Sequence, residues 1–480
     1  MIRKLKWGVN IKKVLLIVPP LSKEELFKRG ASETGSLLPP LGLAYIAALL
    51  EKNGHFVEIL DGIANPTSII DIVRKTQNFD IVGLTAITTF ALRMKELIDA
   101  IKKENSNVKI VVGGPHATAV PMDLINDKSI NFIIVGEGEQ TFLELINRID
   151  GEDYDNIKGL LYKKKGKVCH TEPRELIKDL DILPIPARHL LSMKLYKSSE
   201  ARANKQPSLS MITSRGCPFS CIFCNKNIFG RGFRYHSPEY VVKEMEILKS
   251  KYGAKDIAIW DDNFTVNKER VYKICELIIK KKLNLSWSCE ARVDCVDLDL
   301  LKIMRKAGCD YIAYGIESGS EKVLKKMRKG FTKDDVRRTF SWTKEAKIGI
   351  RAYFILGMID ETTKEMEETI DFAIELEPDI ASFTLWVPLP GTDAYNEVCK
   401  NNELKDPKFW EHQIVPEFNF LDKPIYVPKD IKPSELMHMH QKAYRRFYFR
   451  PKYMLKQITK IRSIEDITRL IKGFLTVVKA

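Results

Sequence analysis

The first 150 residues alternate short apolar runs with longer amphipathic stretches, and this alternation predicts strands and helices in turn. Nearly uninterrupted apolar runs occupy residues 14–18, 55–60, 80–85, 108–113 and 131–136. Such runs are typical of parallel strands buried on both faces of a sheet. The first amphipathic stretch between them, residues 41–54, ends at Gly54, a common helix stop signal. We therefore predict an α/β domain over residues 1–150 with a flavodoxin-like, doubly wound parallel sheet.

The strand-then-helix rhythm weakens and then returns. Residues 151–207 are interpreted as a linker, because they contain a polar hairpin-like stretch at 162–168 and several prolines. Six strand-then-helix units follow within residues 208–400. Six units predict a partly closed (β/α)6 barrel whose strand ends carry the active site. Residues 401–480 are predicted to form a mainly helical C-terminal region that faces the substrate.

Length and composition indicate folded domains in a reducing compartment. A chain of 480 residues is too long for one core, and 44% hydrophobic residues support folded domains. The apolar stretch at 14–21 contains Pro19 and Pro20 and is too short to cross a bilayer. Nine cysteines without an export signal favour an anaerobic cytoplasm. Three of these cysteines lack ligand spacing and are predicted to be buried thiols of the barrel: Cys289, Cys295 and Cys309.

The net charge of +14 is concentrated at the C-terminus. Residues 441–480 contain eleven Lys or Arg against Glu465 and Asp466. No nucleic-acid-binding motif accompanies this charge, so no nucleic-acid partner is expected. Apolar residues recur at helical spacing on the same segment: Leu455, Ile458, Ile461, Leu470, Ile471, Phe474, Leu475 and Val478. We expect this face to dock onto the barrel, and peripheral contact with the inner face of an anionic membrane is the open alternative.

The strongest chemical signal is the segment RGCPFSCIFC at residues 215–224. It places Cys217, Cys221 and Cys224 in a CxxxCxxC pattern. Three thiolates on one short loop can ligate three irons of a [4Fe–4S] cluster, which leaves the fourth iron open for chemistry. The alternative is a zinc knuckle, which usually needs a second cysteine pair or a histidine, and no second such pair is found.

This cysteine loop resembles that of the radical SAM enzymes. The resemblance implies that the open iron chelates the amino and carboxylate groups of S-adenosylmethionine (SAM). Reductive cleavage of SAM then yields a 5′-deoxyadenosyl radical, and the electron comes from a donor of the flavodoxin or ferredoxin type. Cys217, Cys221 and Cys224 would be both metal ligands and catalytic groups, and Phe223 matches the position that packs near the adenine.

Polar residues follow several of the predicted barrel strands, where SAM needs hydrogen-bond donors and acceptors. The resemblance assigns SAM contacts to the segments DDNFT, EARVD and GIESGS. The candidate residues are Phe223, Asp261, Asp262, Asn263, Glu290, Arg292, Glu317 and Ser318. For any single residue, a salt bridge or helix cap at the barrel mouth is the alternative. One departure follows the fifth strand: the family's Pro-Gly-Glu-Thr turn is replaced by residues 359–362, Ile-Asp-Glu-Thr.

The N-terminal half resembles the cobalamin-binding domains that precede many radical SAM cores. The matching segments are LLPPLGLAYIAALLEKNGH, VGLTAITT, VVGGPHAT and VGEGEQTF. The resemblance implies cobalamin contacts from Thr85, Thr88, Thr89, Gly113, Gly114, Pro115, His116, Gly136, Glu137 and Gly138. The motif DxHxxG is absent, so no lower histidine ligand is expected from it. The open alternatives are a scaffold without cobalamin, glycines that only form turns, and a His116 that hydrogen-bonds within its loop.

Together these features predict a cobalamin-dependent radical SAM enzyme, in particular a C-methyltransferase. Its substrate would be a small molecule or a lipid-like molecule with an unactivated carbon, and its cofactors a [4Fe–4S] cluster, SAM and cobalamin. Within the family, the alternative is a cyclisation, oxidation or rearrangement without methyl transfer. Outside it, the alternative is an iron–sulfur binding module that does not cleave SAM.

Overall fold

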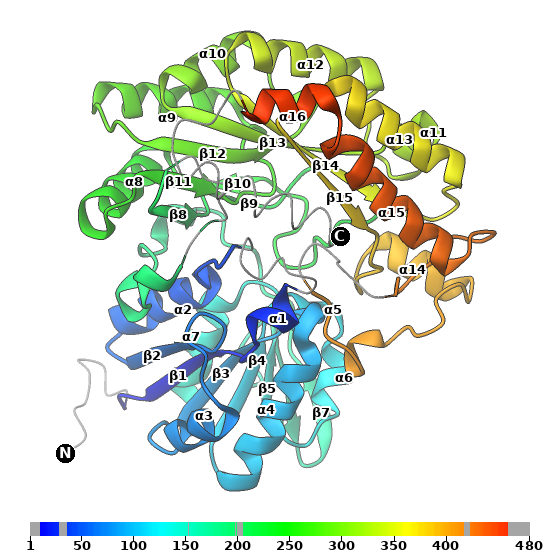
Figure 1. The fold of residues 1–480 in the computed structure, drawn as a ribbon. Helices are drawn as coiled ribbons and strands as arrows, with labels where there is room; N and C mark the ends of the chain where they lie inside the picture. The colour runs from blue at the N-terminus through cyan, green and yellow to red at the C-terminus, as the bar shows by residue number, and fades with distance from the viewer. Residues whose placement is uncertain are drawn as a thin grey trace.

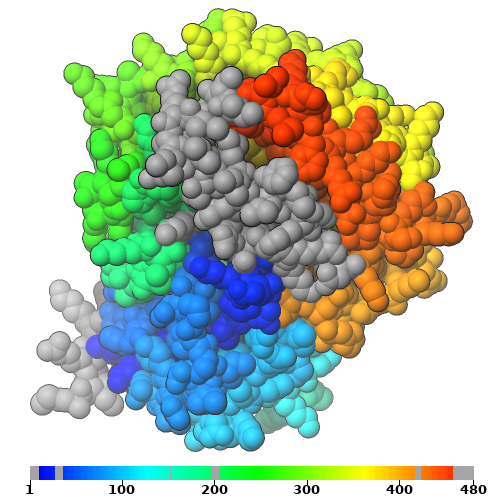
Figure 2. Space-filling view, in the orientation of Figure 1, coloured from blue at the N-terminus to red at the C-terminus, as the bar shows by residue number. Residues whose placement is uncertain are grey.

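A computed structural model describes residues 10–27, 36–151, 153–196, 198, 205–416 and 423–458. Two α/β units form the body of the molecule (Figure 1). The N-terminal unit, drawn in blue and cyan, lies below a second unit drawn in green and yellow, and the orange and red C-terminal helices lie along the second unit. The space-filling view shows the two units in close contact (Figure 2).

The first sheet contains every strand predicted from the apolar runs. These strands are β1 Lys13–Val18, β2 Phe56–Asp61, β3 Ile81–Thr85, β4 Lys109–Gly113 and β5 Phe132–Ile134. They pair in parallel in the order β2-β1-β3-β4-β5. This is the flavodoxin-like order, so the predicted fold of the N-terminal unit is confirmed.

Helices cover both faces of this sheet, which explains why its strands are apolar throughout. On β1, Val14, Leu16 and Val18 belong to one hydrophobic core, whereas Leu15 and Ile17 belong to the other. Helices α2 Leu41–Lys52 and α7 Gly138–Arg148 supply the first core. Helices α3 Ile69–Thr76 and α4 Ala91–Glu104 supply the second. Each fully buried Leu or Ile stabilises the fold by roughly 1.5–3 kcal/mol.

The hairpin predicted at residues 162–168 forms, and it extends the first sheet. Strand β6 Leu160–Lys164 pairs antiparallel with β5, and β7 Lys167–His170 pairs antiparallel with β6. An antiparallel edge strand on an otherwise parallel sheet is common in large mixed sheets. The first sheet therefore continues past residue 150, into the segment that the sequence predicts to be a linker.

The second unit is the predicted partial barrel. Its six strands are β8 Ser208–Met211, β11 Asp256–Ile259, β12 Ser286–Ala291, β13 Cys309–Glu317, β14 Gly349–Leu356 and β15 Ile380–Leu385. All pair in parallel in the order β15-β14-β13-β12-β11-β8. Strands β8 and β15 form the two edges of this sheet, so the barrel is open between them.

The outer helices of the barrel follow the strands in sequence. They are α8 Pro238–Tyr252, α9 Lys268–Lys280, α10 Leu298–Lys306, α12 Lys333–Glu345 and α13 Thr363–Leu376. Their apolar faces and the strands share one large core, which contains the buried thiols of Cys289 and Cys309. Cys295 is also a buried free thiol. The prediction that these three cysteines are buried is confirmed.

Helix α14 Asp393–Lys400 precedes the C-terminal region. Within that region α15 Pro433–Tyr448 and α16 Pro451–Ile458 are helical, and α15 covers the edge strand β15, whereas residues 401–416 and 423–432 are mostly irregular. The hydroxyl of Tyr444 accepts a hydrogen bond from the Phe383 amide at 3.3 Å, and that of Tyr448 accepts one from the Ala381 amide at 3.2 Å. These contacts satisfy edge amides that would otherwise be open to another chain.

Of the apolar residues predicted to form the tail face, only Leu455 has a described side chain, and it is 64% exposed. The others lie outside the described side chains. Two lysines of α16 form ion pairs with the barrel, Lys452 with Glu377 at 2.6 Å and Lys456 with Asp379 at 3.2 Å. None of the helices in the described ranges is long and apolar enough to span a bilayer.

The turn after β14, where Ile-Asp-Glu-Thr stands in place of Pro-Gly-Glu-Thr, is held by its own residues. Asp360 has φ +60°, a left-handed conformation that glycine adopts easily. The Glu361 carboxylate is buried and accepts the amides of Gly357 at 2.7 Å and Met358 at 2.9 Å. Glu361 therefore holds the turn, and burial raises its pKa from 4.5 to about 8.

This shift predicts that the stabilisation contributed by Glu361 falls as pH rises from 4.5 to 8. In that interval the folded state holds the Glu361 proton and the unfolded state does not, so each pH unit costs the fold about 1.4 kcal/mol at most. We expect Glu361→Gln to melt close to the wild-type temperature at pH 5 and clearly above it at pH 8.5. The exposed Glu345→Gln is the control, and an equal pH profile for Glu361→Gln and wild type would contradict the assignment.

Candidate functional site

The three motif cysteines lie on an irregular loop at the mouth of the barrel. The loop follows the short strand β9 Ser214–Arg215. All three thiols are free; Cys217 and Cys221 are partly buried and Cys224 is exposed. The loop is anchored in its middle, since the Ile222 amide donates to Met327 O at 3.2 Å and Ile222 O accepts the Ala394 amide at 3.0 Å. These two hydrogen bonds fix the middle of the loop, between Cys221 and Cys224, at the barrel mouth.

Two residues shape the base of this loop. Gly216 has φ +83°, and a Cβ there would lie 2.3 Å from Gly232 O. Asp261 is buried, and its two oxygens accept the amides and hydroxyls of Thr213 and Ser214 at 2.5–3.1 Å. Asp261, a predicted SAM contact, therefore fixes the segment that leads into the loop, and a direct contact with SAM stays a prediction.

Arg292 lies directly against the cysteine loop. Its guanidinium carbon is 3.6 Å from the centre of the Phe219 ring, and its Nη1 is 3.7 Å from Cys221 Sγ. Asp294 orients the guanidinium through contacts of 3.0 and 2.9 Å. The structure thus places a cation beside one of the predicted cluster sulfurs, where it stabilises negative charge.

Removing this cation is expected to make the cluster harder to reduce. In Arg292→Gln the reduction potential of the reconstituted cluster should fall by on the order of 50 mV, because the reduced cluster carries more negative charge. Redox titration followed by electron paramagnetic resonance (EPR) measures this shift. Arg292→Lys keeps the charge and should retain most of the wild-type potential. A potential unchanged in Arg292→Gln at equal iron content would show that the cation does not act on the cluster.

Lys329 connects three of the predicted SAM residues, although it belongs to no sequence motif. Its Nζ donates to Glu317 Oε1 at 3.1 Å and lies 5.7 Å from the centre of the Phe223 ring. Its carbonyl oxygen accepts from Arg292 at 2.5 Å. Glu317 has φ +71° at an irregular step of β13. Lys329 therefore contacts Phe223, Arg292 and Glu317, and their contact with SAM stays a prediction.

The other predicted SAM residues have different positions. Asn263 and Ser318 are fully buried. The Asn263 side chain bonds within its own turn and to Cys295 Sγ at 3.3 Å, and Ser318 Oγ lies 3.0 Å from Thr369 Oγ1. Both shape the barrel mouth from inside. Glu290 Oε1 accepts the Tyr353 hydroxyl at 3.3 Å, whereas Asp262 is exposed. Cofactor contacts of these four residues stay predictions.

A second residue missed at the sequence level is Lys226, which follows the last cysteine by two positions. Its ammonium nitrogen is buried and has no hydrogen-bond partner among the described residues. Burial raises the pKa of the Cys217 thiol, and the charge of Lys226 acts in the opposite direction. Lys226 therefore supplies positive charge at the site where thiolates must form to ligate iron.

The predicted cobalamin loops meet at the carboxyl ends of β3 and β4. The Ala86 amide donates to Gly113 O at 2.7 Å, and the His116 amide donates to Ala86 O at 3.0 Å. Gly114 has φ +102°, and a Cβ there would lie 2.9 Å from Ala86 O. Its glycine is thus required by close approach of the two loops. Pro115 then begins the short helix α5 Pro115–Ala119.

His116 is buried and hydrogen-bonded within these loops on one side only. Its Nδ1 lies 3.1 Å from Thr88 Oγ1, while its Nε2 has no partner among the described residues. Burial lowers the pKa of His116 to about 4, so the ring is neutral at pH 7. His116 thus makes the hydrogen bond within its loop that was the open alternative, while its contact with cobalamin stays a prediction. The second ring nitrogen is an orphaned polar atom at the strand ends.

The three residues of the loop after β5, Gly136, Glu137 and Gly138, have different surroundings. The Gly136 amide donates to Thr118 Oγ1 at 3.0 Å, and a Cβ on Gly136 would meet no atom within 4 Å. A Cβ added on Gly138 would lie 3.4 Å from Ile46 Cδ1, so glycine lets the start of α7 lie close to Ile46. The Glu137 carboxylate, by contrast, is held by arginines of the barrel side. Open space at Gly136 and the orphaned His116 nitrogen fit a bound corrin, whereas the side chain of Glu137 is engaged elsewhere.

A C-terminal segment closes over the β3 loop. The Val415 amide donates to Thr89 O at 2.8 Å, and the Trp410 ring packs edge-on against His116 with centroids 5.4 Å apart. Phe409 and Trp410 are buried in a small cluster with Ala91 and Val387. This cluster joins the N-terminal unit, the barrel and the C-terminal region. Thr85, at the end of β3, is partly buried, and its Oγ1 would lie 3.0 Å from a Cβ added on Gly114.

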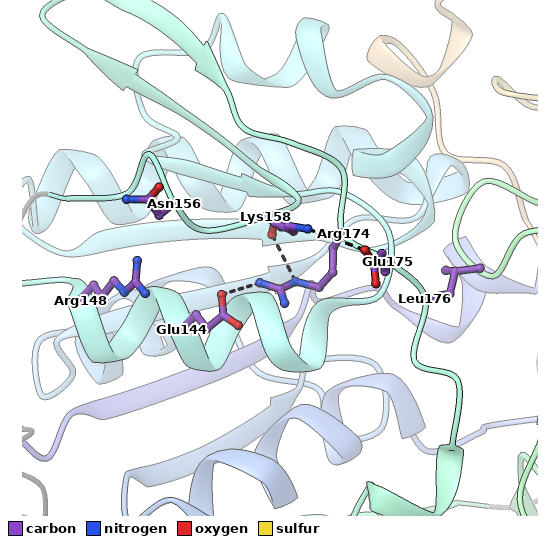
Figure 3. A pocket seen from close by; sticks show the side chains of 7 residues that line it. All are labelled: Glu144, Arg148, Asn156, Lys158, Arg174, Glu175 and Leu176. Atoms are coloured by element: carbon purple, nitrogen blue, oxygen red, sulfur yellow. Dashed lines mark hydrogen bonds and ion pairs between the residues drawn. The ribbon is translucent and has the colours of Figure 1, made fainter.

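One surface cavity lies apart from the cysteine loop, beside α7 (Figure 3). Its volume is about 490 Å³, and charged side chains dominate its lining. Arg174 donates to Glu144 at 2.5 Å and to Lys158 O at 3.3 Å across it. None of the predicted site residues lines this cavity.

The donor set at the barrel mouth fits an iron–sulfur cluster with one open iron. Three free thiols come from one loop, and a buried ammonium and a guanidinium lie beside them. Within the described ranges, no three His, Cys, Asp or Glu side chains lie close enough to hold a single metal ion.

Comparisons with known proteins place both units in established families. Residues 211–373 match the Radical SAM superfamily, and residues 30–146 match the B12 binding domain. A protein of Pyrococcus horikoshii named "Uncharacterized methyltransferase PH0819" is 36% identical over 98% of this chain and 99% of its own. The anaerobic magnesium-protoporphyrin IX monomethyl ester cyclase of Rubrivivax gelatinosus is 30% identical over 90% of this chain and 78% of its own.

Two solved structures share the whole arrangement. The cobalamin-dependent SAM radical enzyme OxsB, solved with aqua-cobalamin and SAM, superimposes with a TM-score of 0.75 over 98% of this chain and 71% of its own, at 20% identity. The radical SAM methyltransferase TsrM from Kitasatospora setae superimposes with a TM-score of 0.70 over 98% of this chain and 99% of its own, at 16% identity. The chain belongs to the cobalamin-dependent radical SAM enzymes, whose cofactors are a [4Fe–4S] cluster, SAM and cobalamin.

Proposed function

We propose that this enzyme is a C-methyltransferase that acts on an unactivated carbon. The observation that carries the proposal is the match to a methyltransferase over nearly the full length of both chains. The chain contains both units that such a reaction needs, and the segment 409–415 joins them by packing on the β3 loop. Two cofactor sites held by one rigid contact can act on the same substrate atom in turn.

When bound, the cluster and SAM supply a hydrogen-abstracting radical, and cobalamin supplies the methyl group. The residues of the chain hold and shield these groups. Cys217, Cys221 and Cys224 ligate iron, and Arg292 lies against Cys221. Lys329 and Glu317 form a buried ion pair beside Phe223, which sets polar groups of both charges at the place predicted for SAM.

The test is a comparison of cell extracts with and without the gene, grown with methionine that carries a deuterated methyl group. We expect one metabolite to carry an additional labelled methyl group only when the gene is present. With that metabolite's precursor, the purified enzyme should form S-adenosylhomocysteine and 5′-deoxyadenosine together. Deoxyadenosine without S-adenosylhomocysteine would contradict methyl transfer.

A second candidate is a radical reaction without methyl transfer, such as a cyclisation. The Rubrivivax gelatinosus cyclase favours it, because that relative is also matched over most of both chains. The same product analysis separates the two reactions. In the second case the substrate changes in oxidation state or ring number, and the deuterated methyl group stays out of the product.

For the partners, we propose a small or lipid-like substrate and a flavodoxin- or ferredoxin-type electron donor, in a cytoplasmic enzyme with peripheral membrane contact. The basic C-terminal sequence and the exposed Met454 and Leu455 of α16 support the membrane contact. Removing residues 452–480, which include Met454 and Leu455, should reduce cosedimentation with anionic liposomes. Equal cosedimentation of the full and shortened chains would contradict the membrane contact.

A further inference from the structure

We propose that Arg215 is a positioning residue that couples the cluster loop to the cobalamin loop, through Glu137 and Glu139. Arg215 precedes the first cluster cysteine by two positions, and the two glutamates follow β5 of the N-terminal unit. The inference applies equally to methyl transfer and to the rival reaction, because it concerns the relative placement of the two cofactor sites.

The contact is short, bidentate and closed to solvent. Arg215 Nη1 lies 2.8 Å from Glu137 Oε1, and Nη2 lies 2.6 Å from Glu139 Oε1. The three side chains are 2–6% exposed. The guanidinium also lies over the rings of Tyr45 at 5.4 Å and Phe229 at 5.3 Å. Arginine suits this place because its planar fork can bond two carboxylates while its face packs on aromatic rings.

Each end of this contact is tied directly to one cofactor loop. On the barrel side, Arg215 is followed by Gly216, whose tight turn leads into Cys217. On the other side, Glu137 lies between Gly136 and Gly138, at the start of α7. A movement of the Gly136 loop on binding cobalamin therefore displaces Glu137, and with it the residue that sets the entry angle of the cysteine loop.

Glu137 has further partners besides Arg215. Glu137 also accepts from Arg234 at 2.9 and 3.0 Å and from the Ile177 amide at 2.8 Å. Arg234 lies on β10 Arg234–Tyr235, which pairs with β9 at Arg215. A charge removed from such a buried network leaves its partners unpaired, so the network tolerates few arrangements.

A role limited to general stability predicts a different result from a coupling role. A stabilising ion pair changes the melting temperature and leaves the two cofactor sites independent of each other. A coupling residue makes the binding of one cofactor depend on the other, and this dependence is reciprocal. The measurable quantity is therefore the change in hydroxocobalamin affinity caused by the cluster, together with the change in the cluster's EPR spectrum caused by hydroxocobalamin.

The experiment uses the full chain, reconstituted anaerobically with iron and sulfide, and hydroxocobalamin as the probe. In the wild type we expect hydroxocobalamin to bind about fivefold or more tightly when the cluster is present, and to alter the EPR spectrum of the reduced cluster. In Arg215→Gln we expect both effects to disappear, while the variant binds as much iron as the wild type. Arg215→Lys should keep part of them, because one carboxylate can still be bound.

Arg174→Gln is the matched control, because Arg174 binds Glu144 of the same helix α7 without touching the cysteine loop (Figure 3). It should couple the two cofactors as the wild type does. If Arg215→Gln does not fold, Glu139→Gln removes one arm of the fork and should weaken the coupling at least twofold. Full coupling in Arg215→Gln or Glu139→Gln, or none in the wild type, overturns the proposal. These readouts need no substrate, so they are independent of the reaction proposed above.

Discussion

Replacing Cys221 by alanine is expected to reduce 5′-deoxyadenosine formation at least about a thousandfold, to the background of the assay. The variant keeps two thiols for a cluster that needs three, so an iron is lost or ligated by solvent. It also removes the sulfur that lies 3.7 Å from Arg292, which leaves that buried cation with one contact fewer. Iron and sulfide content, EPR after reduction, and chromatography of the nucleoside products measure the loss.

Cys275→Ala is the matched control for this substitution. Cys275 is fully buried on α9 and belongs to the barrel core, away from the loop. The same chemical change there should cost about 1 kcal/mol of stability and leave iron content and deoxyadenosine formation at wild-type levels. Substantial deoxyadenosine from Cys221→Ala would show that the loop is not the site of SAM cleavage.

The second large effect is expected from Gly216→Ala, which adds one methyl group to the loop base. That Cβ would lie 2.3 Å from Gly232 O and 3.0 Å from Phe229 O, and both atoms belong to the backbone. Alanine is also disfavoured at φ +83°. We expect a loss of roughly 3 kcal/mol in stability from overlap and strain together. Since the loop must move to relieve the overlap, most of the bound iron should be lost.

Gly232→Ala tests whether this effect is specific. Gly232 supplies the carbonyl that approaches Gly216, yet a Cβ on Gly232 itself would meet no atom within 4 Å. The variant should therefore bind iron as the wild type does. Thermal melting and iron analysis of both variants suffice for the comparison. Wild-type iron content in Gly216→Ala would mean that the loop base is more adaptable than its geometry indicates.

The elements that the sequence predicted are those set by local patterns. Continuous apolar runs locate β1 and its neighbours, because a parallel strand covered on both faces needs apolar residues at every position. The cysteine spacing locates the cluster loop because all three predicted ligands lie within eight residues of one another. These features depend only on residues close together in the chain.

Contacts between distant residues were not predictable in this way. Glu137 was expected to face cobalamin, but its carboxylate binds Arg215, 78 residues later and in the other unit. Lys329 belongs to no recognisable motif, and only the fold brings it to Phe223, 106 positions earlier in the chain. The hairpin at β6 and β7 was predicted as a local unit, but its pairing with β5 depends on the open edge of the first sheet. Periodicity describes which face a residue occupies, and it does not identify the partner on that face.

The most direct test of the account is whether SAM binds the cluster of the wild-type protein and is cleaved there. The protein is reconstituted anaerobically, reduced with dithionite and examined by EPR before and after addition of SAM, and the nucleosides are then analysed. We expect a [4Fe–4S] signal that changes on addition of SAM, followed by formation of 5′-deoxyadenosine. A protein that holds zinc, or a cluster whose spectrum is unaffected by SAM and that yields no deoxyadenosine, would contradict it.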